Sequence, residues 1–111
     1  MENIETDICV IGAGSGGLSV AAGASQMGAS VVLLESGKMG GDCLHFGCVP
    51  SKAMIAAGQA AELFRTSEPF GAAQQEPVID FAQVHRHIHD VIGAIKPNDS
   101  VERFEGLGVH V

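Results

Sequence analysis

Apolar and polar positions follow two different periods along this chain, and the changes of period predict its elements. Residues 6–14 form a β-branched apolar run that ends in glycines, and residues 30–36 form a second such run. Both are expected to be strands buried on both faces. Between them, residues 16–29 place small and apolar side chains at helical spacing, with Gly28 ending the helix. Strand, glycine turn, helix and strand within about 30 residues predict a βαβ unit with a parallel sheet.

The middle of the chain is predicted to turn from irregular to helical. Residues 38–48 are rich in glycine, and a helix is expected to begin near Cys43 and to run to Arg65. Pro50 is tolerated there because it falls in the first turn. Residues 66–78 contain two prolines among small polar side chains and are predicted to be a surface loop.

The last third shows the helical period most clearly. Residues 80–96 carry one apolar stripe, Asp80 and Gln83 are spaced as a capping box, and Pro97 ends the helix. A shorter helix is predicted over residues 99–106, with Asp99 as its N-cap. Residues 108–111 resemble the start of a strand.

Composition and charge limit the function classes. A chain of 111 residues with 46% hydrophobic content is expected to form one folded domain. Its net charge of -7 leaves no basic surface for nucleic acid or anionic lipid. Residues 8–34 hold no charged side chain, but six glycines interrupt them and acidic residues precede them, so no membrane segment or targeting signal is expected. We expect a cytoplasmic protein.

The glycines of the first turn point to a nucleotide. Gly12, Gly14 and Gly17 form G-x-G-x-x-G between a strand and a helix, which permits a tight turn, close approach of a pyrophosphate and close helix packing. Glu35 ends the second strand about 20 residues later, where a carboxylate accepts hydrogen bonds from ribose hydroxyls. A dinucleotide is therefore expected, and the motif leaves open whether it is FAD or NAD.

Two of the three cysteines form the other candidate site. Cys43 and Cys48 are separated by four residues and followed by Lys52, whereas Cys9 lies in an apolar run where it acts as a small hydrophobe. A zinc site is the weaker reading, because further ligands lie far along the chain or within the same loop. Near a helix N-terminus and a lysine, the pair suits a redox-active disulfide whose thiolate is stabilised by positive potential.

The stretch GGDCLHFGCVPSK, with the upstream glycines and Glu35, resembles the redox-disulfide signature of the class I pyridine nucleotide-disulfide oxidoreductases. That family includes lipoamide dehydrogenase, glutathione reductase and mercuric reductase. The resemblance is strong over residues 5 to about 60 and loose beyond. It implies an α/β fold: an incomplete, Rossmann-like βαβ FAD-binding domain with a parallel sheet flanked by helices.

The resemblance also implies roles for individual residues. Electrons pass between NAD(P)H, FAD and a Cys43–Cys48 disulfide, with Cys48 nearest the flavin and Cys43 facing the substrate. Lys52 places its ammonium near the reactive nitrogen of the flavin. The remaining cofactor-binding residues implied are Gly12, Gly14, Gly17, Glu35, Ser36, Gly37, Gly41, Asp42 and Gly47.

One departure concerns Asp42, which stands where family members often have threonine. A buried carboxylate near a diphosphate would be disfavoured by like charge. This change, with Leu44, His45 and Phe46 between the cysteines, favours a mercuric-reductase-like or unassigned branch over a housekeeping lipoamide dehydrogenase.

The resemblance implies a much larger enzyme. Residues 1–111 would be the N-terminal part of the FAD-binding domain, without the nicotinamide-binding and dimerisation domains and inactive alone. The full enzyme would be a homodimer acting on a small-molecule disulfide, a dithiol or a metal ion. The segment itself is expected to expose apolar surface and to pair with another copy. The alternative is a non-catalytic nucleotide- or metal-binding module.

Histidines in the predicted helix over residues 80–96 raise a separate question. His85 and His89 lie one turn apart and flank the apolar stripe, while His87 points elsewhere. We expect solvated or capping histidines there and no native metal site.

Overall fold

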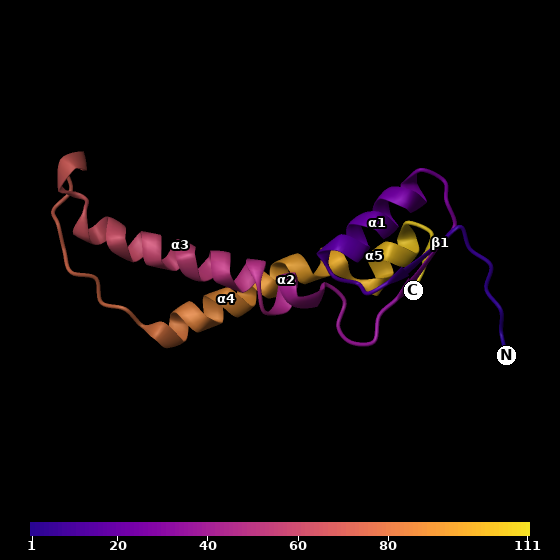
Figure 1. The fold of residues 1–111 in the computed structure, drawn as a ribbon. Helices are drawn as coiled ribbons and strands as arrows, with labels where there is room; N and C mark the ends of the chain where they lie inside the picture. Colours follow the sequence, from indigo (N-terminus) through magenta and orange to yellow (C-terminus); the bar gives the residue numbers. More distant parts are fainter.

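The computed structural model describes residues 1–111 and divides them between a small α/β lobe and a long helical hairpin (Figure 1). The α/β lobe contains β1 (Ile8–Ile11), α1 (Ser15–Gln26), β2 (Val31–Leu34), α5 (Val101–Gly106) and β3 (Val109–His110). The hairpin consists of α3 (Cys48–Arg65) and α4 (Phe81–Ile95). Short α2 (Gly41–His45) lies where the two parts meet.

Three parallel strands form the sheet, in the order β1-β2-β3. Val10 pairs with Leu33 in the β1–β2 register, and Val31 pairs with Val109 in the β2–β3 register. This confirms the predicted βαβ unit and the strand near the end of the chain. No helix of the structure combines the length and the apolar character needed to cross a membrane.

The core lies between one face of this sheet and two helices. Leu18 and Ala21 of α1 and Phe104 of α5 pack against inward-facing strand residues, and Phe104 and Leu33 are essentially inaccessible. The full cluster is Val10, Ala13, Leu18, Ala21, Val31, Leu33, Phe104 and Val109.

Burial of β1 on both faces, as the sequence predicted, is wrong. Ile11 is 84% exposed and Cys9 is also exposed, whereas Val10 between them is buried. The helices cover one face only, so alternate residues of β1 face solvent. In β2 the prediction holds better, because Val31, Val32 and Leu33 are all buried.

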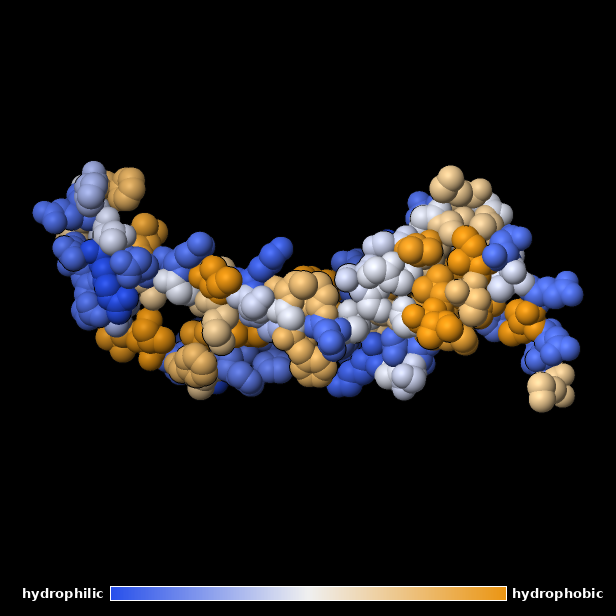
Figure 2. Space-filling model, viewed as in Figure 1, coloured by the Kyte–Doolittle hydropathy of each residue, from blue (hydrophilic) through white to orange (hydrophobic).

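The helical hairpin has far less buried surface. Ala53 and Ile88 are the buried side chains of α3 and α4, and many large apolar residues along both helices are exposed, as Figure 2 shows at the molecular surface. The molecule measures 67 × 26 × 18 Å with a radius of gyration of 20.0 Å. Its elongation comes from this projecting hairpin (Figure 1).

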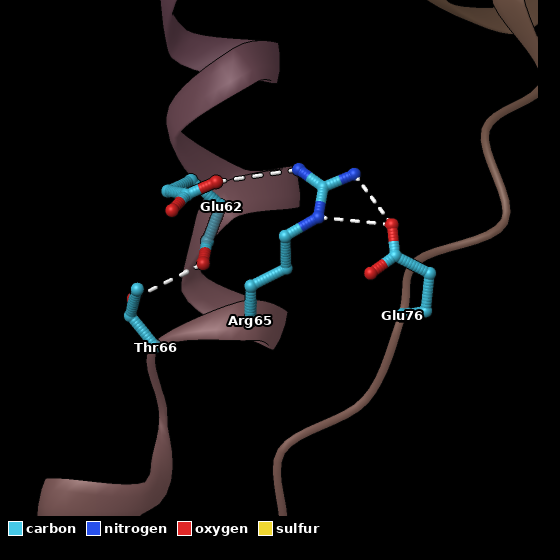
Figure 3. A network of polar contacts seen from close by, with 4 residues as sticks. All are labelled: Glu62, Arg65, Thr66 and Glu76. Carbon is cyan, nitrogen blue, oxygen red and sulfur yellow. Dashed lines mark hydrogen bonds and ion pairs between the residues drawn. The ribbon is translucent and has the colours of Figure 1, made fainter.

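Polar contacts hold the far end of the hairpin together (Figure 3). Arg65 donates to Glu76 through Nε and Nη2 at 3.0 and 2.8 Å and to Glu62 through Nη1 at 3.2 Å. The backbone N–H of Gln75 also donates to the carbonyl of Phe64 at 2.9 Å. The predicted loop is thereby fastened to the end of α3, with the 3₁₀ turn η1 (Glu68–Phe70) inside it.

Two helix boundaries differ from the prediction. The helix expected from Cys43 to Arg65 is broken, because Gly47 has φ −122° and ψ −110° and separates α2 from α3. At α5 the N-cap is Ser100, whose Oγ accepts from the N–H of Arg103 at 3.2 Å. Asp99, the predicted cap, lies instead in the 3₁₀ turn η2 (Lys96–Asp99).

Other boundaries follow the prediction. The carboxylate of Asp80 accepts from the N–H of Gln83 at 3.3 Å and caps α4. Pro50 lies in the first turn of α3, and α1 ends just before Gly28.

Candidate functional site

The turn between β1 and α1 is built from the three motif glycines. Gly12 has φ +101°, and its N–H donates to the carbonyl of Leu34 at 2.7 Å. A Cβ on Gly17 would overlap the carbonyl oxygen of Gly12 and lie 3.2 Å from Val10 Cγ1. Gly14 is the N-cap of α1, and a Cβ there would meet nothing within 4 Å. The turn is thus tight toward the sheet and open at the start of α1.

Glu35 joins this turn to the end of β2. Its Oε2 accepts from the N–H of Ala13 at 2.7 Å and its Oε1 accepts from the N–H of Gly37 at 2.8 Å. These hydrogen bonds, that from Ala13 first, hold the pKa of the Glu35 carboxyl below its usual value. A carboxylate anion is therefore fixed at the carboxyl edge of the sheet.

A hollow opens beside this carboxylate. It has a volume of about 300 Å³ and is lined by Ile11, Gly12, Leu34, Glu35 and Ser36. Ser36 and Gly37 are exposed, as expected for residues that follow a strand at the edge of the sheet. Ligands of open parallel sheets bind in this region, outside the carboxyl ends of the strands.

A second pair of glycines brings the cysteine segment onto the same turn. Gly40 donates its N–H to the carbonyl of Ala13 at 2.8 Å, and a Cβ on Gly41 would lie 2.7 Å from Gly14 Cα. Gly40 also has φ +100°, and a Cβ there would overlap the side chain of Leu44. Segments 27 residues apart therefore meet backbone to backbone where α1 begins.

Sequence analysis missed two residues that support this contact. Ala13 is fully buried and uses both backbone groups, one to Glu35 and one to Gly40. His45 Nε2 lies 2.9 Å from the carbonyl oxygen of Met39 and ties α2 to the preceding turn. Both residues occupy variable positions inside the two motifs, where the sequence gives no sign of a role: alanine has no polar side chain, and the histidine contacts backbone.

The two cysteines come together at the break between α2 and α3. Cys43 is partly buried in α2, Cys48 is the exposed first residue of α3, and both are free thiols. Gly47 allows the chain to double back here, since a Cβ on it would lie only 3.0 Å from the carbonyl oxygen of Asp42.

The environment of the Cys43 thiol disfavours its ionised form. A hydrogen bond from the Cys43 thiol to the Cys48 sulfur raises the pKa of Cys43, and desolvation and repulsion by Cys48 act in the same direction. Lys52 lowers this pKa but is outweighed. The stabilising effect of positive charge that was predicted for the pair is present at Cys43 through Lys52, but it is outweighed, so Cys43 holds its proton against Cys48.

Two further predicted site residues, Lys52 and Asp42, lie at the surface near the cysteine pair. Lys52 is exposed one turn beyond Cys48 on α3. Asp42 is exposed in the first turn of α2. A further hollow of about 420 Å³ is lined by Cys43 together with Ser15, Arg103 and Phe104 among others. Arg103 and Phe104 come from α5, which sequence analysis did not connect with the cysteines.

The sequence of this chain matches one family model and several curated proteins. The family model described as pyridine nucleotide-disulphide oxidoreductase matches residues 6–106. Dihydrolipoyl dehydrogenase of Geobacillus stearothermophilus is 46% identical over 81 residues, which are 73% of this chain and 17% of that protein. Dihydrolipoyl dehydrogenase of Bacillus subtilis is 40% identical over 92 residues, which are 83% of this chain and 20% of that protein.

A relative with another name matches over a similar length. Mercuric reductase of Streptomyces lividans is 36% identical over 91 residues, which are 81% of this chain and 19% of that protein. The chain spans about a fifth of the length of these curated relatives. Since the family model covers nearly the whole chain, the protein belongs to the pyridine nucleotide-disulphide oxidoreductase family.

Proposed function

We propose that this chain is the FAD-binding, dithiol-bearing segment of an oxidoreductase that exchanges electrons between NAD(P)H and a substrate. The observation that carries the proposal is the contact between the thiols of Cys43 and Cys48, on a segment seated directly on the glycine-rich turn. The dihydrolipoyl dehydrogenases and the mercuric reductase that match this chain support the same reaction class.

The residues present fit a dinucleotide. The start of α1 at Gly14 is open, and its unpaired N–H groups favour a pyrophosphate. Beside it, the hollow at Glu35 has room for an adenosine ribose, and each carboxylate oxygen retains a lone pair for a ribose hydroxyl. Ser36, Gly37, Gly41, Asp42 and Gly47 complete the proposed binding surface.

Bound FAD would supply the two-electron carrier between the nicotinamide and the cysteine pair. The chain's own chemistry is thiol–disulfide exchange, in which oxidation of the Cys43–Cys48 dithiol to a disulfide releases two electrons and two protons. Cys43, partly buried and holding its proton, is proposed to meet the substrate, and Cys48 at the start of α3 to face the flavin. Lys52 is proposed to place a positive charge near the flavin ring.

Substrate and assembly belong to the whole protein. A small-molecule disulfide, a dithiol or a metal ion such as Hg²⁺ fits the chemistry of a dithiol, and the names of the relatives are in keeping with these classes. We further propose that the whole protein is a homodimer in the cytoplasm.

Two measurements on the chain test the proposal. On mild oxidation, mass spectrometry should show loss of two hydrogens and a Cys43–Cys48 link, which Cys9→Ser preserves and Cys43→Ser abolishes. With FAD added, reduction should produce a long-wavelength absorbance band that Cys48→Ser removes and Cys9→Ser retains. Oxidation that links Cys9 instead, or a band insensitive to Cys48→Ser, would contradict the proposed roles.

A further inference from the structure

Two histidine rings on α4 lie side by side, away from the cysteine pair in the sequence. His85 and His89 are one helical turn apart, and their Nε2 atoms are 3.1 Å from each other. The ring centroids are 4.4 Å apart and the planes are tilted by 55°. Both residues are exposed, so these nitrogens are accessible to small solutes.

The separation of the two nitrogens matches the bite of a metal chelate. With Zn–N bonds of about 2.0–2.1 Å, two ligand nitrogens lie about 2.9 Å apart at a right angle and about 3.3 Å apart at the tetrahedral angle. The observed 3.1 Å falls between these limits. A proton shared between the rings would give a similar distance, so the geometry suits either a hydrogen bond or a bound cation.

The helix holds this geometry without further rearrangement. Asp80 caps the N-terminus of α4 and Ile88, next to His89, is buried against the rest of the molecule. Histidines at positions i and i+4 share one face of a helix, the spacing with which helices present two imidazoles to zinc. His87 lies apart from them and lines a surface hollow together with Ala57 and Val78.

We propose that His85 and His89 form a two-imidazole chelate for a late first-row divalent cation of the Zn²⁺ or Ni²⁺ type. Imidazole nitrogen is a preferred ligand for these ions, and the net charge of -7 attracts cations to the chain. No cluster of three or more candidate donors occurs in the structure. Water, or a donor from another molecule, therefore fills the remaining coordination positions.

A consequence follows for stability. The two nitrogens are at chelating distance only while α4 is helical, so a cation bound to both stabilises the folded state and raises its unfolding temperature. The cysteine pair would also bind such ions, and the test must remove that contribution.

The experiment uses Ni²⁺ and the complete 111-residue chain, without a histidine tag and with both Cys43→Ser and Cys48→Ser in place. Calorimetric titration should show saturable Ni²⁺ binding, and Ni²⁺ should raise the midpoint of thermal unfolding. His85→Gln or His89→Gln should each weaken binding at least about tenfold. Loss of a residue that only supports a metal ligand already costs about that much affinity, and these changes remove a ligand itself. His87→Gln is the matched control: His87 is exposed on the same helix but lies apart from the pair, so this change should leave binding unchanged.

Circular dichroism of each variant verifies that α4 remains helical, which is expected because the histidines are exposed. Absence of Ni²⁺ binding in the background chain would overturn the proposal. So would binding that survives both His85→Gln and His89→Gln, or that falls equally with His87→Gln. None of these outcomes bears on the redox function, since Cys43 and Cys48 are both replaced in the experiment.

Discussion

Glu35 alone fixes a negative charge at the carboxyl edge of the sheet. Its two carboxylate oxygens accept N–H groups from Ala13, before α1, and from Gly37, after β2. One side chain thus satisfies backbone donors of two loops that lie 24 residues apart in the chain. Its charge is part of the fold as well as of the proposed ribose site.

The lowered pKa of Glu35 predicts how stability depends on pH. A carboxyl whose pKa is depressed on folding stabilises the native state above its unfolded pKa, and this contribution is lost as pH falls through the folded pKa. The stability advantage of the wild type over Glu35→Gln should therefore shrink as pH is lowered from about 7 to about 3.

Urea unfolding of both chains across that pH range measures this difference. Asp7 and Glu76 also have lowered pKa values, through Ser30 and Arg65 respectively, but they are present in both chains and cancel in the comparison. A difference in unfolding free energy that stays constant with pH would count against a stabilising Glu35 carboxylate.

The residue scale also shows where sequence alone is ambiguous. Asp99 and Ser100 are adjacent, and both residue types are good N-caps. The structure uses Ser100, whose hydroxyl accepts from Arg103, while Asp99 lies within the 3₁₀ turn that follows α4. The choice depends on how far α4 and its turn extend, which local spacing does not determine.

At the scale of elements, the fit of α1 against the sheet depends on Gly17. Its Cα approaches the carbonyl of Gly12 so closely that no side chain fits, and the obstacle is backbone, which cannot rotate away. Gly23 lies on the same helix with open space around it.

Gly17→Ala should destabilise the chain by about 1–3 kcal/mol, the usual cost of overpacking a core. Gly23→Ala should stabilise it by about 0.5–1 kcal/mol, because alanine favours a helix interior over glycine. Chemical denaturation of the two variants compares them directly. Equal effects of the same sign would mean that α1 does not pack as closely as described.

Regular elements were predictable because their patterns are local. The apolar run of β2, the stripe of α4 and the cap at Asp80 all follow from neighbours in sequence. The break at Gly47 was not predictable, because it reflects a contact with Asp42 across the turn. The seating of Gly41 on Gly14 was equally hidden, since only the folded chain brings these backbones together.

At the scale of the whole molecule, one face of the sheet lacks a covering layer. Cys9 is exposed on it, together with Ile11 at 84% and Leu34 at 50%. β1 is also an edge strand, with one side unpaired. Exposed apolar surface beside an open edge favours association with another chain. Strand pattern alone predicted burial here, because it does not reveal which face the helices cover.

We expect this chain to self-associate through that face, and Ile11→Thr should shift the equilibrium toward the monomer. Met27→Thr is the control, because Met27 is 89% exposed but caps α1 outside the sheet. Light scattering over a range of concentrations gives the mass of each species. A wild-type mass that stays at one copy throughout would contradict the expectation.

The projecting hairpin makes this chain large for its mass in solution. A compact domain of this length has a radius of gyration of about 13 Å, whereas this chain has 20.0 Å, a value typical of a compact domain of about 330 residues. The radius of gyration measured by X-ray scattering from a single copy should therefore match that of a compact particle nearly three times heavier, and a single copy should elute early from a sizing column. Elution volume alone would therefore overstate the number of copies in each species, whereas a mass measured directly would not.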